Sequence, residues 1–179
     1  MDRHTVLMNA EEMSRTLDRL ASQVLEKRGD NSDLALIGIQ RRGADIAKRL
    51  AAILGQRLES SVPCGALDIA LYRDDWTSVG VRPSVGPTNI SFPIQGRDVV
   101  LVDDVLFTTR TVRAALEALL DFGRPRRVEL LVLVDRGHHE LPIHADYIGM
   151  TVNTARNEHV DVLIQERDGK DEVLLTTRM

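Results

Sequence analysis

The sequence predicts an α/β fold in which a central, mostly parallel sheet is flanked by helices. Two observations carry this prediction. Short apolar runs alternate along the chain with longer segments whose apolar residues recur at a helical spacing. The apolar runs also lack the polar alternation of a half-exposed strand, so their strands are expected to be covered on both faces.

The first predicted element is a helix over 10–28, because its apolar residues form a single stripe. Asn9 and Glu12, spaced three residues apart, resemble a capping box at its start. The apolar run 34–39 then predicts the first buried strand.

A second helix is expected over 43–54, and Gly55 is expected to end it. The run 67–72 predicts another strand, although Asp68 interrupts its apolar character. Residues 73–88 mix charges, Gly and Pro without periodicity, so they are predicted to form a long loop.

The second half repeats the alternation. A strand over 98–102 leads to a helix over 112–122, which Gly123 should end. Four further strands are predicted over 128–134, 145–149, 160–165 and 172–176.

Composition limits the class of protein. A chain of 179 residues with 43% hydrophobic and 28% charged residues fits one globular domain. The net charge of −4 argues against nucleic-acid binding driven by overall charge. No apolar run approaches the roughly 20 residues that a membrane span needs. The single cysteine, Cys64, is expected to be structural, and it favours weakly a reducing, cytoplasmic location.

Three polar segments follow directly after predicted strands: 40–43, 103–111 and 135–138. Ligands of parallel α/β sheets bind beyond the carboxyl ends of the strands. The three segments should therefore meet at one edge of the sheet, and this convergence is a stronger signal than any of the segments alone.

The segment 103–111 has two adjacent acids, Asp103 and Asp104, then a turn rich in hydroxyl groups and a helix that opens at about Val112. Carboxylates can accept hydrogen bonds from the vicinal hydroxyls of a sugar. The turn offers backbone N–H groups, threonine hydroxyls and a helix N-terminus to a phosphate. The alternative is that one acid only caps the helix.

The other two segments allow more than one interpretation. Arg41, Arg42 and Gly43 at a helix start suit a pyrophosphate group, or they form an ordinary solvated helix start. The turn 135–138 could present its backbone to a planar base. We expect no zinc there, because no third ligand accompanies the histidine pair 138–139. The base of the 73–88 loop could close over a charged substrate, or it is a solvated turn.

Together these residues resemble the type I phosphoribosyltransferases. The acid pair and the hydroxyl-rich turn match the motif for phosphoribosyl pyrophosphate (PRPP) of that superfamily. Several stretches are similar to the PyrR family, whose members combine a pyrimidine operon regulator with a uracil phosphoribosyltransferase. They are LYRDD at 71–75, VDDVLF at 102–107, VDRGH at 134–138 and ELPI at 140–143. The resemblance extends over nearly the whole chain.

The resemblance implies a single domain over 1–179 with a small hood and a flexible loop at about 73–88. It implies that uracil and PRPP form UMP and pyrophosphate with Mg²⁺, which is bound through PRPP and not at a direct protein site. The implied catalytic residues are Asp103, Asp104, Arg73 and Asp74. The implied PRPP- and nucleotide-binding residues are Arg41, Arg42, Gly43, Val102, Asp103, Asp104, Val105, Leu106, Phe107, Thr108, Thr109, Arg110 and Thr111, and those beside the base are Val134, Asp135, Arg136 and Gly137.

The family's second activity is binding of pyrimidine operon leader mRNA, promoted by UMP or UTP, by homodimers or larger homo-oligomers. The resemblance implies RNA contacts at His138, His139, His144 and Arg156. The sequence departs from the family here, since His139, His144 and Met150 stand where relatives carry cations. Three lost phosphate contacts would lower the salt-dependence slope of RNA binding by about 3.

A further departure is Thr109, which stands where the family has glycine. A positive φ there would strain a β-branched residue by about 1–3 kcal/mol, whereas its hydroxyl could add a phosphate contact. The sequence thus supports an enzyme and an RNA-binding regulator. It leaves open a related protein with reduced catalysis or RNA binding, and a different base.

Overall fold

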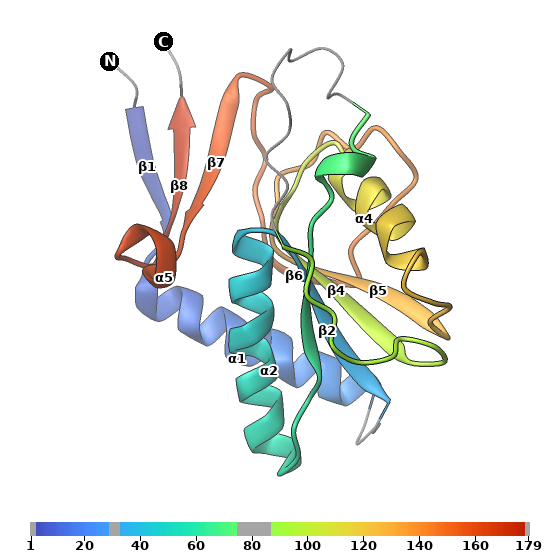
Figure 1. The fold of residues 1–179 in the computed structure, drawn as a ribbon. Coiled ribbons are helices and arrows are strands. Elements are labelled where there is room, and N and C mark those ends of the chain that lie inside the picture. Colours follow the sequence, from blue (N-terminus) through green and yellow to red (C-terminus); the bar gives the residue numbers. More distant parts are fainter. Residues whose placement is uncertain (1–2, 29–32, 75–86, 178–179) are drawn as a thin grey trace.

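The computed structural model describes residues 3–28, 33–74 and 87–177 (Figure 1). Its centre is a parallel sheet with the strand order β3-β2-β4-β5-β6. The predicted α/β class with a parallel sheet is therefore confirmed. The strands are β2 (Leu34–Ile39), β3 (Cys64–Leu67), β4 (Asp98–Leu106), β5 (Arg127–Asp135) and β6 (Tyr147–Thr151).

Helices cover both faces of this sheet. On one face lie α1 (Ala10–Arg28) and α2 (Arg42–Leu58), and α4 (Arg110–Leu120) lies on the other. Successive strand residues pack into opposite layers, as β2 shows: Leu36 packs with α1 and α2, and Ile37 packs with α4. Both faces are buried, which explains the uninterrupted apolar runs. None of the described helices is long and apolar enough to cross a membrane.

A second, antiparallel sheet stands over one end of the first, and we call it the hood sheet. Its order is β1-β8-β7, so the first and last strands of the described chain pair with each other. Its elements are β1 (Arg3–Met8), β7 (Glu158–Leu163) and β8 (Glu172–Thr177), with the short helix α5 (Gln165–Asp168) between β7 and β8.

The hood sheet contains a strand that the sequence did not predict. The sequence predicted β7 and β8 but not β1, whose residues are mostly exposed and lack a clear apolar alternation. The loop predicted at 73–88 falls mainly outside the described residues, which resume at Pro87. The described part of the hood is the sheet β1-β8-β7, in which the two ends of the described chain pair over a long sequence separation.

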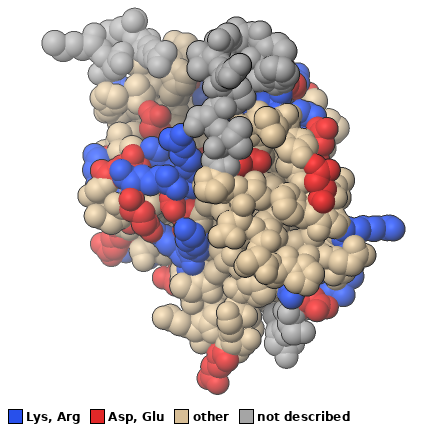
Figure 2. Space-filling model, viewed as in Figure 1, with Lys and Arg blue, Asp and Glu red and all other residues tan. Residues whose placement is uncertain are grey.

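Ion pairs attach α5 to α2 and hold the hood sheet on the core. Arg42 Nη2 lies 3.0 Å from Asp168 Oδ1, and Arg49 Nη2 lies 2.8 Å from Asp171 Oδ1. Figure 2 shows cationic and anionic side chains mixed on this part of the surface, on the left of the view.

Two element ends in the first half of the chain differ from the prediction. The helix α2 does not stop at Gly55 but continues to Leu58, and Glu59 then caps it in the left-handed conformation. The strand predicted over 67–72 ends at Leu67, and a 3₁₀ turn, η1 (Ala70–Tyr72), follows. The side chain of Asp68 explains this end, because its Oδ1 accepts the Ala70 N–H at 2.7 Å and turns the chain.

Candidate active site

The two acids lie inside strand β4 and not in a turn after it. The strand continues to Leu106, because Val105 and Leu106 still pair with β5. The predicted strand end at Val102 was therefore wrong. Consecutive strand residues point to opposite faces, and the acids separate accordingly. Asp103 lines one cavity and Asp104 lines another.

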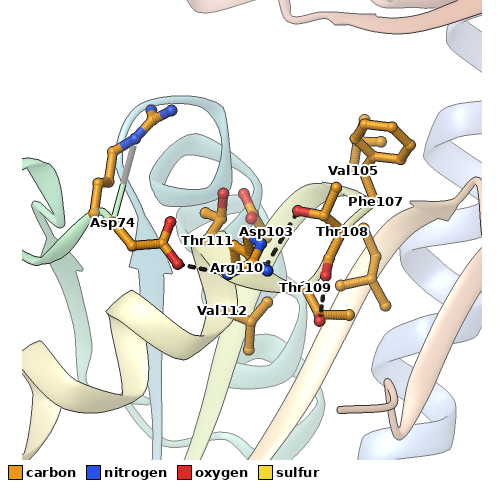
Figure 3. A pocket seen from close by; sticks show the side chains of 11 residues that line it. Asp74, Asp103, Val105, Phe107, Thr108, Thr109, Arg110, Thr111 and Val112 are labelled. Atoms are coloured by element: carbon orange, nitrogen blue, oxygen red, sulfur yellow. Dashed lines mark hydrogen bonds and ion pairs between the residues drawn. The ribbon is translucent and has the colours of Figure 1, made fainter. Parts of the chain in front are cut away.

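The first cavity has a volume of about 360 Å³ and lies where β4 passes into α4. Its floor is the segment 107–111, which we call the hydroxyl loop (Figure 3). The helix begins at Arg110, two residues before the predicted Val112. Its free N–H groups therefore lie at the cavity. The lining residues are Arg73, Asp74, Asp103, Val105, Leu106, Phe107, Thr108, Thr109, Arg110, Thr111 and Val112.

Thr109 has a positive φ of 71°. This is the backbone conformation for which strain was expected at a β-branched residue. Its side chain is 2% exposed. The hydroxyl donates to the carbonyl of Thr108 and accepts the Leu141 N–H at 3.2 Å. Because both hydrogen-bonding roles are used inside the protein, the hydroxyl serves to hold the loop, which disfavours the alternative of an added phosphate contact.

The carboxyl group of Asp103 is buried, and burial raises its pKa well above the usual value, with the charge of Asp104 adding to the rise. Its Oδ1 accepts the Asp104 N–H at 2.9 Å. The start of α2 lies against it, since a Cβ on Gly43 would be 2.6 Å from the Val102 carbonyl oxygen. Glycine at 43 thus permits the close approach of the first predicted segment to the second.

The start of the 73–88 loop lies beside the hydroxyl loop. Arg110 Nη1 donates to Asp74 Oδ2 at 2.7 Å (Figure 3). Its Nε donates to Glu140 Oε2 at 2.8 Å. Arg113 Nη2 donates to the Tyr72 carbonyl at 2.7 Å. These contacts place residues 72–74 at the rim of the first cavity.

The second cavity, of about 220 Å³, lies between the end of β4 and the hood sheet. Asp104 and Arg42 line it from the core, and His4, Asp161 and Thr176 line it from the hood sheet. His4 Nδ1 lies 3.0 Å from the Thr176 hydroxyl, which donates to Asp161 Oδ2 at 3.0 Å. Sequence reasoning missed these three residues, because no local pattern shows that β1 packs with β8.

The two arginines that were predicted to lie at the pyrophosphate differ in their surroundings. Arg42 is the first residue of α2, and its ion pair with Asp168 raises its pKa. Arg41 is exposed, and the Gln40–Arg41 peptide bond is cis. The segment 40–43 thus lies at the predicted edge of the sheet, with the Arg42 side chain turned toward α5.

The predicted base-side residues lie at the end of β5. Val134 is buried, and Asp135 Oδ1 accepts the Gly137 N–H at 2.9 Å and contacts His139 Nε2 at 2.8 Å. Arg136 is 4% exposed, and this burial lowers its pKa. Its side chain is used within the protein, which leaves backbone groups to face a base.

The residues predicted to contact RNA differ in exposure. His144 and Arg156 are exposed, whereas His138 and His139 are half-buried and hydrogen-bonded within the protein. The third predicted segment does meet the second, because Arg136 N–H donates to the Leu106 carbonyl at 3.1 Å. The predicted convergence of the three segments is confirmed, and their roles remain predictions.

Residues 6–167 match the family model described as the phosphoribosyl transferase domain. The fold and the site thus define a phosphoribosyltransferase. The "Bifunctional protein PyrR" of Syntrophobacter fumaroxidans is 51% identical over 95% of this chain and 91% of its own length. That of Thermus aquaticus is 54% identical over 94% and 93%. The chain belongs to the PyrR family.

Solved structures agree on the fold. A hypoxanthine phosphoribosyltransferase of Trypanosoma cruzi is similar with a TM-score of 0.71 and 17% identity, over 98% of this chain and 97% of that one. A Staphylococcus aureus hypoxanthine phosphoribosyltransferase gives a TM-score of 0.68 at 20% identity, over 97% and 92%. At these identities the likeness concerns the arrangement of elements only.

Proposed function

We propose that this phosphoribosyltransferase transfers the phosphoribosyl group of PRPP to uracil, giving UMP and pyrophosphate. The cavity over the hydroxyl loop carries this proposal. It joins a helix N-terminus, threonine hydroxyls and a carboxylate in one hollow of about 360 Å³, which is within the usual range for small-ligand sites.

In the proposed complex, the backbone N–H groups and hydroxyls of Thr108 and Thr111 hold the 5′-phosphate. The ribose lies across the end of β4, so that Asp103 reaches its hydroxyls from the loop side and Asp104 from the hood side. The turn 134–137 borders the base. Arg73 and Asp74 stand at the rim, where a closing segment would exclude water.

Pyrophosphate would lie by the backbone of 41–43, at the start of α2. Among the residues that the structure describes, no group of three or more His, Cys, Asp or Glu side chains is placed to hold a metal ion. Mg²⁺ would therefore take most of its ligands from PRPP and water, with Asp103 or Asp104 as the nearest carboxylates, and it would neutralise the leaving pyrophosphate.

The expected transition state has oxocarbenium character at the ribose. Such a reaction needs no covalent nucleophile on the protein. The residues of this chain contribute by holding the phosphate and the ribose in line with the base, and by supplying negative charge near the developing cation.

The test is UMP formation from uracil, PRPP and Mg²⁺, with Asp104→Asn as the control for background. We expect clear turnover that the substitution lowers by roughly a hundredfold or more. Turnover no higher than that of Asp104→Asn would contradict the proposal. Hypoxanthine and orotate in place of uracil test the choice of base, and a UMP co-crystal with its phosphate at 107–112 tests the site.

We also propose that the protein binds pyrimidine leader RNA in response to uridine nucleotides, because the relatives are named bifunctional. The exposed His144 and Arg156 favour a contact surface beside the active site. A symmetric homodimer would present that surface twice.

Binding to a leader stem-loop should tighten with UMP, and His144→Arg should strengthen it further by adding a phosphate contact. A fluorescence titration with a scrambled RNA as control measures both effects. Equal binding of both RNAs without any response to nucleotide would rule out this second role.

A further inference from the structure

Arg136 is a buried cation at the end of β5. It is 4% exposed, and the charge of Glu158 attracts it, although no carboxylate in the described parts of the chain forms an ion pair with it. Its guanidinium donates instead to neutral acceptors: the Thr154 hydroxyl at 3.2 Å and the carbonyl oxygens of Ala155 at 3.3 Å and Glu158 at 2.6 Å. Burying a cation whose hydrogen bonds all go to neutral acceptors is costly, and a further contact favours arginine here.

That contact is with Phe107. The Arg136 Cζ lies 3.9 Å from the centroid of the Phe107 ring, which is the distance of a stacked guanidinium. His138 meets the same ring with its edge, at 5.7 Å between centroids. Phe107 directly precedes Thr108, and it lines the first cavity. Its ring position therefore bears on where the hydroxyl loop lies.

Both neighbours of the ring also hold one further segment. His138 Nε2 lies 2.6 Å from the Thr154 carbonyl oxygen, and the Thr154 hydroxyl lies 3.2 Å from the Arg136 carbonyl oxygen. The segment 154–158 leads directly into β7 of the hood sheet. Two parallel connections thus run from the hydroxyl loop, through the Phe107 ring, to the start of the hood.

We propose that Arg136 is a positioning residue that couples the hydroxyl loop to the hood sheet through its stack on Phe107. Its side chain then does not contact the base, although the turn that carries it does. The consequence for catalysis rests on the proposed function, since a loop fixed to the hood holds the phosphate and the ribose in one geometry. The coupling itself is a property of the folded chain and can be measured without substrate.

The first experiment measures amide hydrogen exchange of residues 154–160 in the full-length protein. Phe107→Leu keeps an apolar side chain but removes the ring face, so exchange should become roughly three- to thirty-fold faster there. Phe92→Leu is the matched control, because Phe92 also faces an arginine, Arg97, at 5.7 Å. Unchanged exchange in Phe107→Leu, or an equal change in the control, would overturn the coupling.

The second experiment tests why arginine is needed. Arg136→Lys keeps the charge but loses the planar group that stacks on Phe107. This variant should therefore lose the coupling, and its kcat/KM for PRPP should be roughly tenfold lower than that of the wild type. The double variant with Phe107→Leu should lose little more than the worse single variant. Wild-type kinetics in Arg136→Lys, or fully additive losses, would contradict the positioning role.

The two proposals fail in different ways. Accelerated exchange in Phe107→Leu without any turnover in the wild type would remove the proposed function and retain the coupling. Normal wild-type turnover with unchanged exchange in Phe107→Leu would remove the coupling and retain the proposed function.

Discussion

At the scale of single residues, the site retains side chains that cost the fold stability. Asp103 is buried beside another acid, and its pKa is raised. Well below its ordinary pKa of 3.8, the carboxyl group is protonated in both the folded and unfolded states. As the pH rises above its ordinary pKa of 3.8, the unfolded chain loses the proton first, so the free energy of unfolding falls.

Asp103→Asn should therefore be more stable than the wild type at pH 8 and equal to it at about pH 2.5, while losing activity. Each unit by which the pKa is raised corresponds to about 1.4 kcal/mol. The amide oxygen can still accept the Asp104 N–H, so the local structure should persist. Thermal unfolding at the two pH values measures the difference, and a lower melting temperature of the variant at pH 8 would contradict the prediction.

The adjacent residues Thr108 and Thr109 are expected to have different roles. Thr109→Val keeps the shape but leaves the half-buried Leu141 N–H without its acceptor, so the free energy of unfolding should fall by about 1–3 kcal/mol. Thr108→Val is the matched variant, and it should instead raise the KM for PRPP with little change in stability. Denaturant unfolding and steady-state kinetics of both variants check this, and the reverse assignment of the two effects would count against it.

At the scale of elements, local sequence patterns predicted the helices and strands correctly where residues close in sequence determine the structure. The helix α1 has its predicted bounds, and Asn9 and Glu12 form the reciprocal hydrogen bonds of a capping box at 2.8 and 2.9 Å. The pattern was insufficient for β1 and for the length of β4. There the pairing partner decides the structure, and the partner is distant in sequence.

The attachment of α5 to α2 should be sensitive to acid. Hydrogen bonds from Arg49 lower the pKa of both Glu166 and Asp171. Their stabilising contribution is present above the ordinary values of 4.5 and 3.8, and it is lost as the pH falls through the lowered ones. Arg49→Met should therefore be less stable at pH 7 and lose less stability between pH 5 and pH 2. Chemical unfolding across this range tests it, and parallel pH profiles would refute it.

At the scale of the whole molecule, two sheets share the site. The parallel sheet supplies the acids and the hydroxyl loop, which could be predicted because parallel strands present their carboxyl ends at one edge. The hood sheet supplies His4, Asp161 and Thr176. The place of these three residues at the site could not be predicted from the sequence. No residue pattern within either chain end indicates that these ends pair.

Deletion of residues 1–8 should loosen the hood sheet and leave the parallel sheet intact. It removes β1 and makes the central strand β8 an edge strand. Amide exchange should accelerate in β7 and β8, with β4 and β5 as internal controls, and UMP formation should fall because His4 is lost from the second cavity. Faster exchange throughout the molecule, or none, would show that the two sheets are not separable in this way.

The pairing of β1 with β8 also determines the order in which parts of the molecule can fold during synthesis. Thr5 leaves the ribosome early, yet its partner Leu175 is made only after all five strands of the parallel sheet. The nascent chain can therefore complete its core while β1 is still unpaired. The second cavity closes last, so a partly synthesised chain holds a formed hydroxyl loop without the hood residues that complete the site.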